Sequence, residues 1–306
     1  MKTNTYTGKV LLYYKYVALE NPQKILKWQR KLCTELGLTG RIIIAREGIN
    51  GTVGGSTESI DRYRTIMQEN ELFADVDYKE SPGGAQCFPR LRIVVKDEIV
   101  HLGIDPAALS PSNGGKHLKP HETHQLLAEK PDDLVIIDCR NAFEAQVGKF
   151  KDAIVPPVNH FREFPEYVDT NKELFDNKQV LLYCTGGVRC ERATAYVKEK
   201  TSAKEVYQMD GGIHRYVEQY PDGFFRGKNY VFDNRIAVRV NDDVIGTCAL
   251  CARPCDDFNN CLNAECNKHF VCCDACAKQY HHTCSKTCME LVDSNKVKKR
   301  PLLEKV

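Results

Sequence analysis

The 306-residue chain lacks several features that would assign it to a membrane or a secretory route. No apolar run approaches the roughly 20 residues that a membrane-spanning helix needs. The first residues also lack the apolar core of a secretory signal. We therefore expect a cytoplasmic protein that has no membrane partner.

The chain also lacks an excess of charge of either sign, a long internal repeat and any low-complexity segment. Its 43 Lys and Arg residues against 41 Asp and Glu residues give a formal net charge of +2. Bulk electrostatics therefore neither indicate nor exclude a nucleic-acid partner. We interpret a basic run at 296–300 as a solvated tail rather than as a dedicated RNA-binding arm. The sequence has no flavin or nicotinamide motif and no evident facial triad of iron ligands.

Cysteine, in contrast, is abundant and unevenly placed, with ten of the 15 cysteines between positions 248 and 288. Because no export signal is present, metal ligation explains them better than a disulfide framework. Their C-x2-C, C-x3-C and C-x4-C spacings are typical of structural zinc sites, and ten sulfurs suffice for two four-ligand sites. An iron–sulfur cluster or free thiols remain as alternatives. The candidate ligands are a subset of Cys248, Cys251, Cys255, Cys261, Cys266, Cys272, Cys273, Cys276, Cys284 and Cys288.

The pattern of strands and helices predicts a multidomain α/β protein. Residues 1–105 carry the order β-α-β-β-α-β, which predicts a ferredoxin-like α+β sandwich. A Pro-, Ser- and Gly-rich stretch at 105–119 is the predicted linker. Residues 116–228 alternate strands with helices and predict a parallel sheet wrapped by helices. A small Cys-rich, metal-binding-type segment follows at 229–290, and a basic tail at 291–306.

The most informative motif lies at residues 180–197. A short apolar run predicts a buried strand, a glycine-containing loop opens with Cys184 and closes with Arg189, and a helical pattern follows. Inward-facing loop amides and the helix N-terminus together favour an anion. We therefore expect a lowered pKa for the Cys184 thiol and covalent chemistry at its sulfur. The alternative is an ordinary buried cysteine on a glycine turn.

The length of this loop narrows the chemistry. Its C-x4-R spacing is one residue shorter than the C-x5-R loop of cysteine phosphatases, so the ring of amides suits one extra sulfur atom. This is the rhodanese pattern, in which the cysteine carries a persulfide, so the α/β segment at 116–228 is predicted to be a rhodanese-like domain. Thr185 can offer a hydroxyl to the sulfur, and Gly186 and Gly187 allow close backbone approach. Val188 completes the loop, and Arg189 either stabilises an anion or bonds loop carbonyls.

Three further residues are expected to support the loop. Asp138 and Arg140 follow a buried strand, and a bracing role is favoured for this pair. Cys190 either resolves a persulfide or disulfide, or packs beneath the loop, and packing is favoured. The spacing forces no histidine into the role of a base, so activation of Cys184 must come from amides and the helix end.

These motifs resemble the rhodanese-domain tRNA uridine hydroxylases over most of residues 8–290. The resemblance implies oxygen-dependent conversion of the wobble uridine, position 34 of tRNA, to 5-hydroxyuridine, with Cys184 as the active-site cysteine. It implies molecular oxygen as co-substrate and the tRNA anticodon loop as partner. The alternative is a sulfurtransferase that moves sulfane sulfur through a Cys184 persulfide. The resemblance rests on Ala45-Arg-Glu-Gly-Ile-Asn-Gly-Thr-Val-Gly-Gly55, Ile137-Asp-Cys-Arg-Asn141, Phe161-Arg-Glu-Phe-Pro-Glu-Tyr-Val168, Tyr183-Cys-Thr-Gly-Gly-Val-Arg-Cys-Glu191 and Gly211-Gly-Ile213.

The first of these blocks contains three candidates for RNA contact, Arg46, Glu47 and Asn50. A ferredoxin-like sheet can offer a face to RNA, with Arg46 on a phosphate and Asn50 on a base edge. The wobble base would then be unstacked toward the reactive cysteine. The alternative is a tight turn held by Gly48 and Gly51, with Asn50 in a left-handed conformation.

Overall fold

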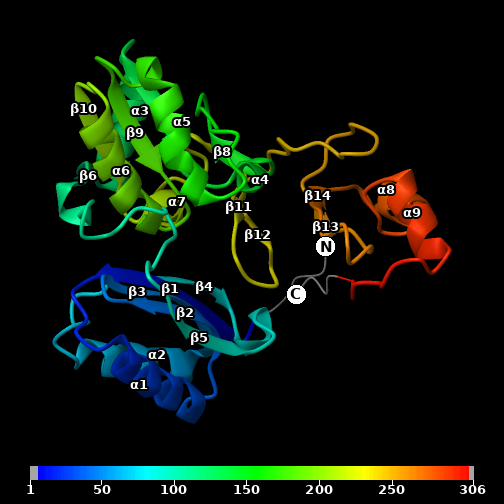
Figure 1. Cartoon of the computed structure of the whole chain (residues 1–306), viewed down its shortest axis with the longest axis horizontal. Helices are drawn as coiled ribbons and strands as arrows, with labels where there is room; N and C mark the ends of the chain where they lie inside the picture. The colour runs from blue at the N-terminus through cyan, green and yellow to red at the C-terminus, as the bar shows by residue number, and fades with distance from the viewer. Residues whose placement is uncertain (1–5, 303–306) are drawn as a thin grey trace.

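The computed structural model describes residues 6–302 and arranges them in three parts (Figure 1). The first five residues of the predicted N-terminal domain and the last four of the predicted tail lie outside this range. Among the described residues, no helix has both the length and the hydrophobicity needed to cross a bilayer.

The N-terminal part is a five-stranded sheet with two helices on one face, in the strand order β4-β1-β3-β2-β5. The neighbours in β4-β1-β3-β2 are antiparallel, and β5 adds parallel to β2 at the edge. This topology confirms the predicted ferredoxin-like sandwich. Its elements are β1 (Gly8–Tyr16), α1 (Pro22–Glu35), β2 (Thr39–Ala45), β3 (Gly48–Ser56), α2 (Thr57–Gln68), β4 (Tyr78–Gly83), η1 (Ala85–Cys87) and β5 (Leu91–Val95).

Local sequence sets where both helices of this part begin. The Asn21 side chain accepts a hydrogen bond from the Lys24 backbone N–H at 3.0 Å, and Pro22 occupies the first turn of α1. Proline costs little there because the first helical N–H groups have no partner within the helix. Ser56 caps α2 in the same way by accepting from the Ser59 N–H at 3.1 Å.

The second part is a parallel sheet in the order β6-β10-β9-β7, with helices around it. This confirms the predicted rhodanese-like α/β architecture. Strand β6, however, lies inside the predicted linker, because its three residues pair only with β10 and carry no local signal of their own. The elements are η2 (Pro111–Asn113), β6 (Lys116–Leu118), α3 (Pro120–Glu129), β7 (Leu134–Asp138), α4 (Ala142–Ala145), β8 (Gly148–Phe150), η3 (Phe161–Glu163), α5 (Phe164–Thr170), η4 (Lys172–Leu174), β9 (Gln179–Tyr183), α6 (Val188–Lys200), β10 (Glu205–Met209) and α7 (Gly212–Gln219).

The third part begins with a hairpin and ends in the Cys-rich region. Strand β11 pairs with β8 of the second part and with β12, so the boundary predicted between 228 and 229 falls inside a strand. The Cys-rich region lies to one side of the other two parts (Figure 1). The elements are β11 (Phe225–Tyr230), β12 (Ala237–Arg239), β13 (Phe258–Asn260), β14 (His269–Val271), α8 (Asp274–Gln279) and α9 (Lys286–Asp293).

The β11–β12 hairpin extends from the second part to the N-terminal part (Figure 1). At its tip, the Asn234 N–H donates to the Cys87 carbonyl at 2.8 Å. The Arg235 guanidinium donates to the Ser81 hydroxyl at 2.8 Å and to the Pro82 carbonyl at 2.7 Å. One hairpin therefore touches both α/β parts before the chain enters the Cys-rich region.

A buried ion pair also joins the N-terminal part to the parallel-sheet part. The Arg192 side chain on α6 is fully buried and donates to a Glu47 carboxylate oxygen at 3.0 Å and to the Ile104 carbonyl at 2.7 Å. A carboxylate oxygen of Glu98 lies 3.5 Å from the same guanidinium. One arginine thus compensates two buried carboxylates that belong to the other part of the chain.

Replacing Arg192 by Met should destabilise the protein, because the buried carboxylates of Glu47 and Glu98 lose their guanidinium partner. We expect the free energy of unfolding to fall by about 3–5 kcal/mol at neutral pH. Burial already raises the pKa of Glu47, and loss of the arginine raises that pKa further. Protonation then relieves the repulsion, so the loss should be smaller near pH 5 than near pH 8. Urea unfolding at both pH values measures it.

The matched control is Arg30→Met, because Arg30 lies exposed on helix α1. Its effect should stay within about 0.5 kcal/mol. Equal unfolding midpoints for the two variants would show that the buried ion pair contributes nothing.

Candidate active site

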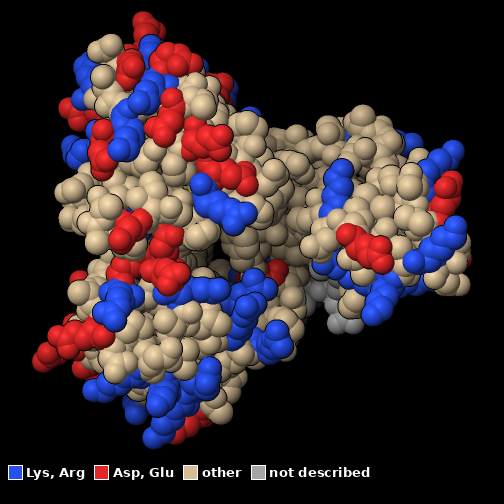
Figure 2. Space-filling view, in the orientation of Figure 1, with Lys and Arg blue, Asp and Glu red and all other residues tan. Residues whose placement is uncertain are grey.

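A cavity of about 720 Å³ lies where the three parts meet, and Cys184 lines it. The open face of the N-terminal sheet contributes Leu12 and Asn50, and the β11–β12 hairpin contributes Val231 and Val238. Figure 2 shows a hollow surface between the N-terminal part and the other parts, bordered by both Lys/Arg and Asp/Glu side chains. Cavities of this volume accommodate ligands of nucleotide size.

The Cys184 loop turns its amides toward the sulfur. The Gly187 N–H donates to the Cys184 Sγ at 3.1 Å, and the side chain of Cys184 is fully buried. The first turn of helix α7 fixes the loop backbone from the other side: Ile213 N–H donates to the Cys184 carbonyl at 2.9 Å, and His214 N–H to the Thr185 carbonyl at 3.1 Å. The loop is therefore held between the starts of two helices.

This environment favours the thiolate form of Cys184. Burial alone would raise the pKa of the thiol above its ordinary value of 9.0. A hydrogen bond with Cys190, the charge of Arg189, and the N–H groups of Arg189 and Gly187 overcome burial and lower the pKa to about 5. Burial raises the pKa of Cys190 well above its ordinary value, so Cys190 stays protonated and donates to the thiolate.

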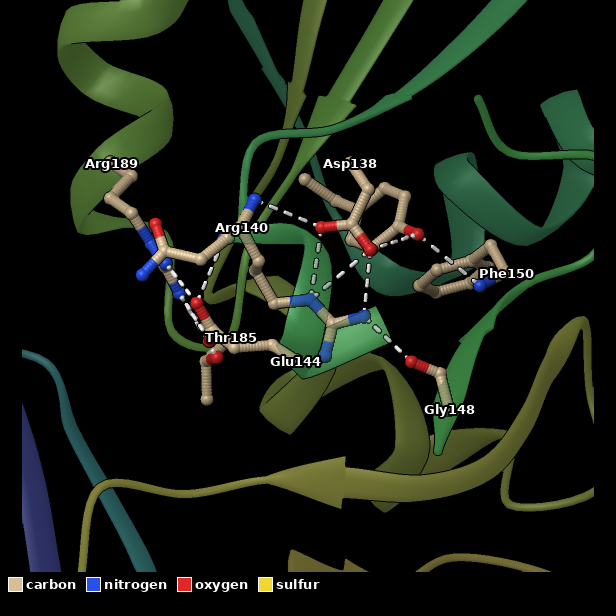
Figure 3. A network of polar contacts seen from close by, with 9 residues as sticks. Asp138, Arg140, Glu144, Gly148, Phe150, Thr185 and Arg189 are labelled. Atoms are coloured by element: carbon tan, nitrogen blue, oxygen red, sulfur yellow. Dashed lines mark hydrogen bonds and ion pairs between the residues drawn. The ribbon is translucent and has the colours of Figure 1, made fainter. Parts of the chain in front are cut away.

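Arg189 is held by a carboxylate rather than by loop carbonyls (Figure 3). Its two terminal nitrogens donate to the two oxygens of Glu144 at 2.6 and 3.0 Å. One of them also donates to the Thr185 hydroxyl at 3.4 Å, so this hydroxyl accepts a hydrogen bond from the arginine. Glu144 is fully buried. The planar guanidinium is thus fixed by bidentate bonds while its charge remains close to Cys184.

Asp138 and Arg140 form a fully buried brace beside the loop (Figure 3). Arg140 donates to both oxygens of Asp138, with a shortest distance of 2.7 Å, and to the Gly148 carbonyl at 2.7 Å. The Tyr183 hydroxyl donates to Asp138 at 2.8 Å and accepts from the Phe150 N–H at 3.3 Å. The pair therefore ties strands β7, β8 and β9 together directly before Cys184.

The N-terminal sheet packs directly over the two glycines of the loop. A Cβ atom at Gly186 would lie 2.8 Å from Leu12, and one at Gly187, where φ is +102°, would lie 2.8 Å from the Tyr14 hydroxyl. The same hydroxyl donates to Glu191 on α6 at 2.9 Å. These glycines therefore leave room for the N-terminal part as well as for the sulfur.

The structure separates the three candidates for RNA contact. Asn50 lies in strand β3, paired with Tyr14 and Ile43, and lines the Cys184 cavity. The alternative of a tight turn at Asn50 is wrong: the chain turns between β2 and β3, at Arg46 and Glu47, and Asn50 has a negative φ.

The other two candidates lie elsewhere. Arg46 is exposed and lines a second cleft of about 830 Å³, whose lining does not include Cys184. The assignment of Glu47 to RNA contact needs correction. One of its carboxylate oxygens accepts a hydrogen bond from Arg192, and the other accepts one from the Ile99 N–H at 2.7 Å. Its carboxylate is therefore used within the protein, and we no longer assign it to RNA.

The Cys-rich region brings eight of its ten cysteines into two groups of four. Within each group, all sulfurs lie within 4.8 Å of one another, so each group can hold a metal ion. Cys255 and Cys272 are buried outside both groups. The cysteine pairs of the two groups alternate along the chain, so the segment between the two pairs of one group contains a pair of the other group. They are Cys248, Cys251, Cys273 and Cys276, and Cys261, Cys266, Cys284 and Cys288.

Two important site residues carried no signal in the sequence. Glu144 follows the Asp138–Arg140 motif by four residues and resembles an ordinary helix residue until α4 folds against the loop. Tyr14 lies on strand β1, 170 positions before Cys184, and only the domain contact brings it to Gly187. Alternation along β1 could have indicated which face is open, but not what that face covers.

Comparison with known families divides the chain in the same order as the fold. Residues 8–99 match the UPF0176 acylphosphatase like domain, residues 119–219 the rhodanese-like domain and residues 226–289 the rhodanase C-terminal family. The fold and the cysteine loop thus define a rhodanese-like domain protein with an acylphosphatase-like N-terminal domain.

Relatives over nearly the whole chain narrow this class. A tRNA uridine(34) hydroxylase of Corynebacterium urealyticum is 41% identical over 292 residues, which cover 93% of this chain and 98% of the relative. One of an Arthrobacter species is 42% identical over 281 residues, covering 88% and 94%. One of the Aster yellows witches'-broom phytoplasma is 39% identical, covering 94% of each chain. The chain belongs to the tRNA uridine(34) hydroxylase family, which confirms the predicted family.

We expect the thiolate of Cys184 to persist at acid pH. Because its folded-state pKa is about 5, the rate of alkylation by iodoacetamide should stay nearly constant above about pH 6 and fall below about pH 5. In Cys190→Ala, the thiolate loses a donor, and the pKa of Cys184 should rise by about one to two. Mass spectrometry of the peptide that contains Cys184 follows the rate.

Cys33→Ala is the control, because Cys33 lies in the N-terminal core away from the cavity. It should leave the pH profile of Cys184 unchanged. If Cys190→Ala and wild type share one midpoint, Cys190 does not stabilise the thiolate.

Proposed function

We propose that this chain hydroxylates the wobble uridine of tRNA at C5, with Cys184 as the nucleophile. The observation that carries the proposal is the match of about 41% identity to named tRNA uridine(34) hydroxylases over 93% of the chain. The lowered pKa of Cys184 and a cavity of nucleotide size beside it support the same reaction. Both tRNA and reduced thiols belong to the cytoplasm, where we place the reaction.

The thiolate of Cys184 adds to C6 of the uracil, which forms an S–C6 bond and moves the C5–C6 electron pair onto C5 and O4. C5 then takes one oxygen atom from dioxygen, and a two-electron donor reduces the other atom to water. Loss of the C5 proton and cleavage of the S–C6 bond restore the ring and the thiolate. Uridine, dioxygen, two electrons and two protons thus give 5-hydroxyuridine and water.

The residues around Cys184 fit this sequence of steps. Arg189 and the loop amides stabilise the thiolate before attack and after release. Cys190 donates to the same sulfur. Glu144 keeps Arg189 in place, so the charge does not have to reorganise during the reaction.

The substrate we propose is the anticodon loop of tRNA, with base 34 unstacked into the cavity. Strand β3 places Asn50 in the same cavity, where its carboxamide Nδ2 donates to the Ile99 carbonyl at 3.0 Å. Arg41 and Arg162 are exposed residues of the cavity lining and suit phosphates of the loop. Arg46 would contact RNA only beyond the cavity, across the second cleft.

A sulfurtransferase is the second candidate, because the C-x4-R loop and the lowered pKa also suit a Cys184 persulfide. The cavity volume favours the hydroxylase, since a sulfane sulfur donor such as thiosulfate fills little of about 720 Å³. The two candidates differ in product, and both products can be measured.

Cys184→Ser should abolish the reaction, because an alcohol at this position is not ionised near neutral pH. In a strain that lacks the gene, we expect wild type to restore 5-hydroxyuridine in tRNA, as measured by nucleoside mass spectrometry. Cys184→Ser should leave it at the level of the deletion strain. Cys33→Ala, in the N-terminal core, should restore it fully.

Unchanged 5-hydroxyuridine with Cys184→Ser would exclude Cys184 as the nucleophile. Conversion of thiosulfate and cyanide to thiocyanate by the wild type, with no effect on tRNA, would instead support the sulfurtransferase.

For the Cys-rich region, we propose that each group of four cysteines binds one zinc ion. Zn–S bonds of about 2.3 Å in a tetrahedron place sulfurs about 3.8 Å apart. The Cys251–Cys273 sulfur distance is 3.8 Å, and Cys266–Cys284 is 3.6 Å. Bound zinc would stabilise a region whose strands have only three residues each.

Elemental analysis of the purified protein should find about two zinc ions per chain, one for each group. Cys251→Ser removes one ligand of the first group and should lower the content to about one or less. Cys255→Ser is the control, because Cys255 belongs to neither group, and it should retain both ions. Iron with acid-labile sulfide, or no metal at all, would contradict zinc binding.

A further inference from the structure

One buried side chain that lines the Cys184 cavity carries a polar atom left unpaired by the residues that the structure describes. Asn229, on strand β11, is 5% exposed, and its side-chain Oδ1 has no hydrogen-bond partner among residues 6–302. The residue lines the same cavity as Cys184. Buried polar atoms are almost always hydrogen-bonded, so an unpaired carboxamide oxygen on a residue that lines a cavity points to a partner on a ligand.

The position of this side chain is set by a paired backbone. Asn229 lies opposite Val238 of β12, and the preceding residues of β11 pair with β8. Side chains alternate along a strand, so Asn229 shares a face with Val231, which also lines the cavity. Val238 and Val240 line it too, so the carboxamide has apolar neighbours on the adjacent strand.

We propose that Asn229 binds the Watson–Crick edge of the target uracil, an inference that rests on the proposed hydroxylase function. Its Oδ1 accepts from uracil N3–H, and its Nδ2 donates to uracil O4. A carboxamide supplies this donor and acceptor side by side, as the uracil edge requires. The opposite edge of the ring, C5 and C6, then stays free for Cys184.

This assignment makes Asn229 a substrate-binding residue with a distinctive mutational signature. Asn229→Leu is similar in size and removes an unpaired buried polar atom, so its unfolding midpoint should be unchanged or higher. The value of kcat/KM for tRNA should fall about 10- to 100-fold. The loss should appear mainly in KM, because the edge is bound alike in substrate and transition state.

The matched control is Asn241→Leu, in the same part of the chain. The Asn241 Oδ1 accepts from the Gly227 N–H at 2.9 Å, and its Nδ2 donates to the Phe225 carbonyl at 2.9 Å. The same substitution there should lower the unfolding midpoint. A structural role for Asn229 would give the Asn229 variant this same pattern.

A binding experiment tests the inference apart from the reaction. The side-chain amide of Asn229 is assigned by NMR as the signal that disappears in Asn229→Leu. A short anticodon stem-loop RNA with uridine at position 34 should shift this signal in the wild type. The same RNA with N3-methyluridine at position 34 should not, because it lacks the N3–H donor.

The outcomes separate the inference from the proposed function. A shift with uridine alone supports uracil-edge binding even if no 5-hydroxyuridine is formed, in which case only the hydroxylase proposal fails. No shift with either RNA, or equal shifts with both, overturns the role of Asn229. Full activity of Asn229→Leu overturns it as well.

Discussion

The geometry of the site depends on holding one negative sulfur in a buried position. Burial disfavours the thiolate of Cys184, yet its pKa falls to about 5 because a thiol, a guanidinium and backbone N–H groups converge on it. The guanidinium of Arg189 brings its own desolvation cost, which the buried carboxylate of Glu144 offsets. The thiolate of Cys184 thus requires the guanidinium of Arg189, and that guanidinium requires the carboxylate of Glu144.

The N-terminal part completes this site rather than merely accompanying it. Its open sheet face covers Gly186 and Gly187, and Arg192 joins it to helix α6 through Glu47. A small sulfur donor would need no such cover, whereas a base drawn out of an anticodon loop requires walls on several sides. The covering sheet therefore fits the proposal that this rhodanese-type loop acts on a nucleotide.

The sequence predicted the features that depend on residues close together in the chain. Asn21 and Ser56 cap their helices through contacts within four residues. The C-x4-R loop and the paired cysteines can be recognised from their spacing alone. The sequence did not predict the features that depend on contacts between distant segments. Glu144 gains its role only when α4 packs on the loop, and Asn50 extends in β3 because β1 and β2 pair on either side of it. Glu47 looked available for RNA because Arg192 lies 145 positions away.

The Cys-rich region contacts the hairpin that lines the Cys184 cavity. A single carboxylate, Asp256, bonds both strands of the β11–β12 hairpin: Lys228 at 2.9 Å and Arg239 at 2.6 Å. Asp256 directly follows Cys255 and lies between the first two cysteine pairs of the crossed groups. The ion pairs of Asp256 therefore connect the Cys-rich region to β11, the strand that contains Asn229. The region whose cysteine groups can hold metal ions is thereby connected to one wall of the Cys184 cavity.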